Sequence, residues 1–438
     1  MGGGGPGDRM SLATREEQTW FGQPRGLTVL FLTNMWEQFS YYGMRALLVY
    51  YMTKQLMFAQ GHASLVYGAY TATAYFTPIV GGVIADRYLG KRRAILIGGS
   101  IMAFGHFMMT FEMLLYPALV TIALGNGLFL PSLPSQIDDL YEKGDPRVGW
   151  AYNIYYVGVN IGGFLAPLIC GTLGELYGWH WGFGAAGIGM GLGLAIYVWG
   201  QKYLPEQSRS RSGVPAAKLG GGIGRFPKDI VILLSAVALS VVVFRGAYEQ
   251  VGNTLALWAD TGVDRTVGAT EIPMTWFQSL NPLLVMLMTP PLLGWWRRRA
   301  ESGRREHPAR KMATGALIVG AAYLLLALLE ALGGPTHWLW LVAFFVIFTF
   351  GELYILPTGL GLFARLAPAG LGATTVAAWY LTIFAGSLGA GVVGTLWSVT
   401  NHALYFAFLA GLAALAAGML RLIDPLEMRI EDEVSQPG

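Results

Sequence analysis

Long apolar stretches separated by short polar loops make up most of this chain, and they constrain its fold more than any other feature. Of its 438 residues, 54% are hydrophobic and only 13% are charged, whereas soluble domains carry about 25% charged residues. A helix that crosses the hydrocarbon core of a membrane needs about 20 apolar residues. We therefore predict an all-α polytopic membrane protein with twelve spans, which run roughly over 27–57, 64–85, 93–113, 116–140, 148–172, 182–200, 228–258, 272–296, 312–332, 337–365, 371–397 and 402–423.

Lysine and arginine gather in every second loop, around residues 87–93, 143–147, 202–228 and 297–311, whereas in the other loops Arg265 is the clear exception. Because cytoplasmic loops of membrane proteins are rich in these residues, we expect both termini to be cytoplasmic and the protein to lie in the cell inner membrane. The Gly-rich segment at the start lacks the apolar core of a signal peptide. We interpret it as a cytoplasmic tail.

The polar stretch 201–227 is rich in Gly, Ser and basic residues, a composition typical of a flexible linker. It divides the spans six and six, so the expected units are roughly a tail 1–26, a bundle 27–200, a linker 201–227, a bundle 228–423 and a tail 424–438. This is the layout of the major facilitator fold, which places its substrate site between the bundles. The sequence GVIADRYLGKRR at 82–93 resembles that superfamily's G-x-x-x-D-R-x-G-R-[KR] signature with one extra residue. We expect Asp86 to bridge to its basic cluster; the alternative is an ordinary basic cytoplasmic loop.

Charged residues inside the apolar stretches are Glu37, Glu249 and Glu352, accompanied by Arg45 and Arg245. An ionisable side chain at membrane depth is costly, usually paired and usually functional. Acids and bases inside an apolar bundle are what a proton-coupled carrier of charged solutes needs. Three further acids fall at helix ends near water, and we interpret them as structural: Glu112, Glu175 and Glu330.

The sequence gives no sign of cofactor chemistry. Cys170 is the single cysteine, which excludes a disulfide framework and a cysteine metal site. No phosphate-binding loop, metal cluster or nucleophile triad is recognisable. We therefore expect no metal, no cofactor other than protons as the coupling ion, no bound nucleic acid and no enzymatic activity.

Several motifs in a fixed order resemble the proton-dependent oligopeptide transporter (POT) family. The first span reads NMWEQFSYYGMRA at 34–46, similar to the family's E-x-x-E-R-F-S-Y-Y-G-M-R. The later matches are GAYTATAYFTPIVGG at 68–82, YYVGVNIG at 155–162, YEQ at 248–250, SLNP at 279–282, GEL at 351–353 and WYL at 379–381. The resemblance covers nearly the whole membrane region, and it implies a symporter that imports di- and tripeptides by alternating access.

The chain departs from the family pattern at several positions. Asn34 and Gln38 replace the first Glu and the Arg of E-x-x-E-R, and Leu130 stands where the fourth span usually has Lys. Arg245 stands where a Trp is common. Many bacterial members also insert two helices between the bundles, but the linker here is too short to cross a membrane twice.

The resemblance implies a set of substrate-binding residues. The peptide ammonium would be met by Glu352, Asn160 and Asn281, and the carboxylate by Arg45. Aromatic side chains suit varied peptide side chains because they combine a broad apolar face with a polar edge. The residues expected to line the side-chain pockets are Tyr41, Tyr42, Tyr75 and Trp379.

Arg245 matches in sign the lysine that is lost at Leu130, so we hypothesise that it replaces part of the missing cation. Arg245 and Glu249 are four residues apart on one helix face and can pair. The resemblance also implies that Arg45 and Glu249 form a pair that bridges the two bundles on the outer side. Glu249 could then exchange between Arg45 and Arg245. Glu37 has no arginine beside it and is expected to be the first proton carrier, with Glu249 second.

The sequence leaves alternatives open. Glu37 can be a polar packing residue, Arg245 can extend toward the membrane surface, and the tyrosines can simply fill the bundle core. A same-fold carrier of another small organic or inorganic anion and an uncoupled peptide facilitator are alternative functions. We expect small peptides, protons and the lipid bilayer as partners of a monomeric protein.

Overall fold

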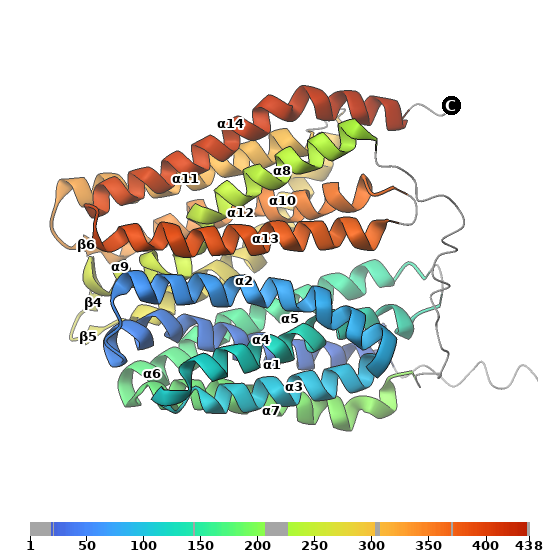
Figure 1. The fold of residues 1–438 in the computed structure, drawn as a ribbon, viewed down its shortest axis with the longest axis horizontal. Coiled ribbons are helices and arrows are strands. Elements are labelled where there is room, and N and C mark those ends of the chain that lie inside the picture. Colours follow the sequence, from blue (N-terminus) through green and yellow to red (C-terminus); the bar gives the residue numbers. More distant parts are fainter. Residues whose placement is uncertain are drawn as a thin grey trace, which may run out of the picture.

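Helices make up most of the described structure (Figure 1). The structure is a computed structural model, and it describes residues 19–20, 22–142, 145–205, 227–302, 307–368 and 371–435. In chain order the helices are α1 (Arg25–Tyr50), α2 (Gln60–Ile84), α3 (Lys91–Met108), α4 (Leu115–Ser132), α5 (Val148–Ala166), α6 (Thr172–Tyr177), α7 (Trp179–Gly200), α8 (Lys228–Tyr248), α9 (Thr254–Thr261), α10 (Leu280–Glu301), α11 (Pro308–Leu332), α12 (Trp338–Arg365), α13 (Gly372–Thr395) and α14 (His402–Ser435).

Short elements connect the helices. A π-helical turn, η6 (Pro167–Gly171), joins α5 to α6, and a 3-10 helix, η9 (Met274–Ser279), precedes α10. The strands form two-residue pairs: β1 (Thr19–Trp20) with β2 (Gln23–Pro24) and β4 (Thr266–Val267) with β5 (Thr270–Glu271), both antiparallel, and β3 (Val263–Asp264) with β6 (Thr336–His337), parallel.

The helices form two halves, with α1–α7 in the lower half and α8–α14 in the upper half of Figure 1. Each half has its own apolar core, which includes Met44 and Leu47 in the first half and Phe344 and Phe348 in the second. Helices α2 and α13 lie side by side between the halves. A Cβ atom at Gly68 of α2 would lie 2.5 Å from the Cα of Gly391 in α13, so this close approach requires glycine.

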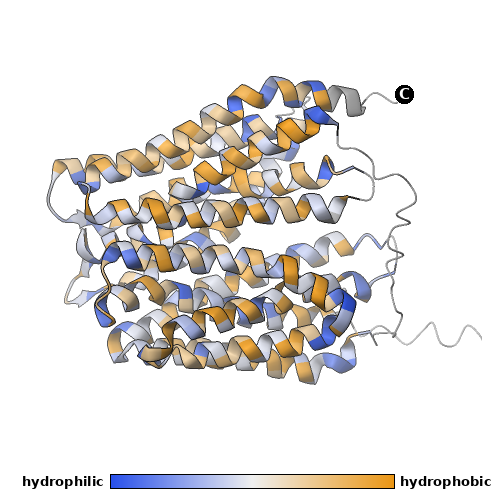
Figure 2. Ribbon diagram, viewed as in Figure 1, coloured by the Kyte–Doolittle hydropathy of each residue, from blue (hydrophilic) through white to orange (hydrophobic). Residues whose placement is uncertain are grey.

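Eight helical segments of the described residues are long and apolar enough to cross a membrane by length and composition. Of the other long helices, α1 carries Glu37 and Arg45, and α3 and α10 carry basic residues at the end of the molecule where α1 begins. Apolar residues dominate the helices and hydrophilic ones concentrate near their ends (Figure 2). The prediction of an all-α polytopic membrane protein is confirmed.

The molecule has two different ends. We call the end where α1 begins and α14 ends the basic end, because α3 begins there with Lys91 and Arg92 and α10 ends there with Arg298 and Arg299. Helix α9 lies at the opposite end, and η9 packs beside it (Figure 1). Helix α14 continues to Ser435, past the expected end of the last span at 423. This extension packs on α11: Asp424 accepts hydrogen bonds from Arg310, at 2.9 and 2.6 Å, and Glu427 accepts the amide of Ala309 at 2.8 Å.

The loop after α2 differs from the expectation for its motif. Asp86 makes no ion pair in the part of the chain that the structure describes, and instead Lys91 pairs with Asp139 at 2.7 Å. Arg92 donates to the carbonyl oxygens of Leu204 and Pro205 at 2.8 and 2.7 Å. The basic side chains of the motif, rather than its acid, therefore hold this loop to its neighbours. Residues 206–226 of the predicted linker lie outside the described residues.

Candidate functional site

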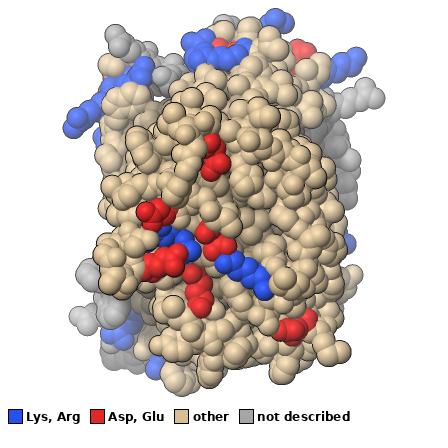
Figure 3. All heavy atoms as spheres, turned by 90° about the vertical axis from the view of Figure 1, so that its left-hand side faces the viewer, with Lys and Arg blue, Asp and Glu red and all other residues tan. Residues whose placement is uncertain are grey.

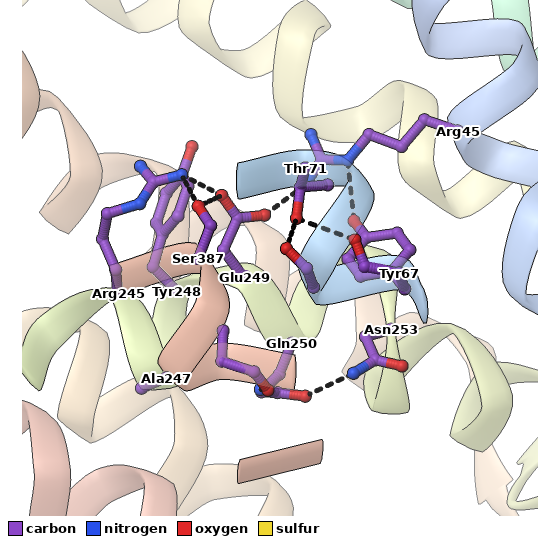
Figure 4. A network of polar contacts seen from close by, with 12 residues as sticks. Arg45, Tyr67, Thr71, Arg245, Ala247, Tyr248, Glu249, Gln250, Asn253 and Ser387 are labelled. Carbon is purple, nitrogen blue, oxygen red and sulfur yellow. Dashed lines mark hydrogen bonds and ion pairs between the residues drawn. The ribbon is translucent and has the colours of Figure 1, made fainter. Parts of the chain in front are cut away.

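Glu249 lies between two arginines at the boundary of the halves (Figure 4). Arg45 of α1 donates from Nη2 to Glu249 Oε2 at 2.8 Å, which joins the first half to the second. Arg245, one turn earlier than Glu249, contacts the other carboxylate oxygen. Both Arg245 and Glu249 are 2% exposed. The predicted pairing of Arg245 with Glu249 is confirmed, and Glu249 holds both arginines at once rather than one of them.

Neighbouring side chains fix this three-charge cluster. Tyr67 of α2 accepts from Arg45 Nε at 2.7 Å, and Ser387 of α13 accepts from Arg245 Nη2 at 3.1 Å. The adjacent Gly386 leaves room for Arg245, because a Cβ atom there would lie 2.7 Å from the Arg245 Cβ. Arg245 therefore does not extend to the membrane surface. Its guanidinium group is directed into the boundary between the halves.

Glu352 forms a second polar cluster in the upper half. Its carboxylate accepts from the hydroxyl of Tyr248 at 2.6 Å and from the amide of Asn281 at 2.5 Å. The Tyr248 ring also faces Arg245, whose guanidinium carbon lies 5.3 Å from the ring centroid. Tyr248 therefore joins a cationic end, formed by Arg45 and Arg245 around Glu249, to an anionic end at Glu352.

Among the described residues, Glu37 makes no polar contact with either cluster. It is 1% exposed, and its carboxylate accepts from the side-chain amide of Gln38 at 2.7 Å. Asn34 donates to the backbone oxygen of Tyr155 in α5 at 3.2 Å. Of the two substituted positions of the family motif, Gln38 thus donates to the buried carboxylate of Glu37, while Asn34 joins α1 to α5.

The remaining predicted residues divide between the site and the helix cores. Tyr75 lies beneath Arg245, with the guanidinium carbon 5.2 Å from its ring centroid, while Tyr41 and Tyr42 pack edge to face at 5.4 Å. Asn160 donates within its own helix, to the oxygen of Tyr156 at 3.0 Å. Trp379 is 3% exposed and packs on Phe363 in the core of the upper half, so the structure does not bring it to the charged clusters.

Sequence reasoning missed three side chains of this site: Tyr67, Tyr248 and Ser387. Tyr67 and Ser387 lie on α2 and α13, on other helices than the charges that they contact, and Ser387 is 142 residues from Arg245. Only the position of Tyr248, between Arg245 and Glu249 on the same helix, signalled that it lies beside the cluster. Paired charges that join two helical halves, with a second acid nearby, are the arrangement of a membrane transporter that opens and closes around a charged solute.

Comparisons with known proteins place the chain among such transporters. The model of the POT family matches residues 92–218 and 228–408. A curated relative, the uncharacterized transporter YclF of Bacillus subtilis, is 32% identical and covers 94% of this chain and 96% of its own. The di-/tripeptide transporter of Lactococcus lactis subsp. cremoris is 30% identical, with coverage of 94% and 97%.

Solved structures agree with this assignment. A peptide transporter POT, crystallised in complex with sulfate, superposes with a TM-score of 0.85 at 29% identity, covering 94% of this chain and 97% of that one. A POT family transporter bound to 5-aminolevulinic acid gives a TM-score of 0.84 at 25% identity, with coverage of 94% and 98%. The fold and site therefore define a multi-pass transporter of the major facilitator class. The chain belongs to the POT family.

Proposed function

We propose that this protein is a proton-coupled symporter that imports di- and tripeptides. The observation that carries the proposal is the link through Tyr248 between two buried arginines and a buried carboxylate. A peptide is a zwitterion, and buried charges are matched by opposite charges or binding is lost to desolvation. Relatives named as di-/tripeptide transporters, which align over nearly the whole chain, support the same cargo.

The peptide carboxylate binds at the cationic end of this link, and the ammonium binds at Glu352 beside Asn281. Arg45 binds the carboxylate directly, and Arg245 contributes the second cation that Leu130 does not supply. Tyr75 lies against the cationic end, where Tyr41 and Tyr42 extend the aromatic surface for peptide side chains. Asn160 and Trp379 are assigned to the site only by the family resemblance.

Protons are carried first by Glu37 and second by Glu249. Glu37 is buried, and its hydrogen-bond partner among the described residues is a neutral amide, so gain and loss of a proton there leaves no ion pair broken. Glu249 gains a proton when a substrate carboxylate takes its place beside Arg45. The coupling therefore does not require the full E-x-x-E-R motif, and no metal or other cofactor takes part.

The basic end faces the cytoplasm, which follows from its lysines and arginines, so both termini are cytoplasmic and the opposite end faces outward. The protein acts as a monomer in the cell inner membrane. The halves rock about the central site, with Arg45 and Glu249 closing the outer side. The inner halves of α4, α5, α12 and α13 close the inner side.

Uptake of labelled dialanine into liposomes that hold the purified protein tests this function. We expect concentrative uptake with an inward proton gradient and only equilibration when the gradient is collapsed. An Asn34→Glu/Gln38→Arg variant restores the usual motif and is the matched comparison. Absence of uptake in both proteins would refute the peptide assignment and favour another small anion as cargo.

An uncoupled peptide facilitator is the second candidate, favoured by the neutral side chains at Asn34 and Gln38. In that case the native protein would only equilibrate dialanine across the membrane, and the variant with the restored motif would concentrate it. The same liposome assay therefore separates the two candidates.

A further inference from the structure

Glu175 joins the two halves at the outer end, away from the central site. It lies on α6, in the first half, and its carboxylate accepts three hydrogen bonds from η9 of the second half. The donors are the amides of Met274 and Thr275, at 3.0 and 2.9 Å, and the hydroxyl of Thr275, at 2.5 Å. The first amides of a helix have no partner within the helix, and a carboxylate is a strong acceptor for them. Glu175 therefore caps a helix of the opposite half.

The fit around this contact is close on both sides. The chain at η6 is π-helical, and Gly171 at its end lies against Thr275, so a Cβ atom there would overlap the threonine side chain. Trp276 donates from Nε1 to Thr172 Oγ1 at 2.8 Å, and Gln278 donates to the oxygen of Ala46 at 3.3 Å. The whole of η9 is thus seated on α1, η6 and α6, and Glu175 supplies a charged contact across the boundary.

We propose that Glu175 is an outer latch, a term we use for its contacts with Met274 and Thr275. Its carboxylate stabilises the outer-closed state and must release η9 before a solute can enter from outside. On the outer face, several acidic side chains lie close to basic ones near the middle, and further charged side chains lie toward the rim (Figure 3). Another pair across the boundary joins Lys54 to Asp260 of α9 at 2.6 Å, but these side chains are 42% and 13% exposed, so solvent weakens the pair. The half-buried latch adds three hydrogen bonds to this closure.

The latch predicts how readily the outer side opens. If the outer-open form is the minor state, the rate at which a buried interface thiol reacts from outside is proportional to its population. Loss of the carboxylate should raise that population about tenfold, which corresponds to about 1.4 kcal/mol. The proposal relies on the rocking of the two halves and not on the nature of the cargo.

A single reporter cysteine at Ser279 tests the latch. Ser279 is 2% exposed at the end of η9, and the Ser279→Cys change is nearly isosteric. In a Cys170→Ala background, labelling by a membrane-impermeant maleimide added from outside should be slow. Glu175→Gln should accelerate it about tenfold.

Glu112→Gln is the matched control. Glu112 is also an acid at the outer end, but it accepts from Gln55 of its own half at 2.6 Å, so its loss should leave the labelling rate unchanged. Thr275→Val removes only the hydroxyl contact and should increase the labelling rate less than Glu175→Gln does. Combined with Glu175→Gln, it should give no further increase. If Glu175→Gln does not fold, Thr275→Val is tested in its place. If the folded variant, Glu175→Gln or its replacement Thr275→Val, is labelled at the native rate, the latch proposal is refuted. Because this readout needs no substrate, failure of the peptide assignment would not affect it.

Discussion

Arg245→Met tests whether the second arginine takes part in binding the substrate carboxylate. The guanidinium contacts Glu249 and Ser387 and is buried. Methionine keeps the length and the apolar stem of the side chain but removes every donor. Breaking a buried ion pair from one side costs about 3–5 kcal/mol when the remaining charge has no partner. Glu249 still holds Arg45 at 2.8 Å, so the loss of stability should fall below that range and the variant should fold.

Substrate affinity should change much more than folding. Arg245 aids the carboxylate either by contacting it or by drawing Glu249 away from Arg45, and both routes depend on one charge-assisted hydrogen bond. Such a bond contributes about 1.5–3 kcal/mol, and each 1.4 kcal/mol is about a tenfold change in affinity. We therefore expect roughly 10- to 150-fold weaker binding of dialanine.

The assay is competition of unlabelled dialanine against a labelled dipeptide on the purified protein. Arg245→Lys keeps the positive charge and should recover part of the affinity. Arg297→Met makes the same chemical change at a side chain that is 83% exposed and pairs with Glu301 of its own helix, so it should bind like the native protein. Native affinity in a folded Arg245→Met protein would refute the role of Arg245.

Three further predictions concern other parts of the molecule. Glu37→Gln keeps a partner for Gln38 but carries no proton, so peptide exchange across liposomes should persist while concentrative uptake is lost; continued accumulation would remove Glu37 from that role. Glu352→Gln should weaken dialanine binding about tenfold or more without changing the binding of N-acetyl-dialanine, which has no ammonium, and an equal loss for both ligands would contradict the assignment. Gly81→Ala should lower the melting temperature in detergent, at a cost of about 1–3 kcal/mol, because its Cβ would overlap the carbonyl of Gly127. Gly294→Ala, with open space around it, is the control. Equal melting temperatures for the two variants would show that α2 and α4 can move apart.

The charged part of the site could be predicted because few residues are available for it. An apolar membrane segment makes each acid or base conspicuous, and helical periodicity alone places Arg245 and Glu249 on one face. The contact between Arg45 and Glu249, on helices about two hundred positions apart, was expected from the family resemblance and not from spacing. The roles of these residues in transport stay predictions.

The neutral and peripheral parts could not be predicted in the same way. Ser387 and Tyr67 are ordinary residues in membrane helices. Tyr67 reaches Arg45 because α2 lies beside α1, and Ser387 reaches Arg245 because α13 packs on α8. Glu175 was interpreted as structural because it lies near water at a helix end, but its partners are mainly backbone amides of another half, which no side-chain pattern reveals. The extension of α14 was missed because Asp424 and Glu427 interrupt its apolar pattern, yet both are buried against α11.

The position of the second cation suggests how Glu249 behaves when the outer side opens. Arg245 and Glu249 lie on one turn of the same half, whereas Arg45 belongs to the other half. A buried carboxylate without a partner is costly, so on opening Glu249 should stay with Arg245 and leave Arg45, which is 17% exposed, free for the substrate.

Glu249→Gln combined with Arg245→Met separates the two ways in which Arg245 can act. If Arg245 serves to draw Glu249 away from Arg45, then removing the charge of Glu249 also removes the competitor, and the double variant should bind dialanine at least about tenfold more tightly than Arg245→Met alone. If Arg245 contacts the substrate carboxylate itself, Glu249→Gln restores nothing and the losses of the two single variants add. Competition binding on the native protein, both single variants and the double variant gives the coupling directly. An additive result would refute the exchange of Glu249 between the arginines while leaving Arg245 as a direct ligand.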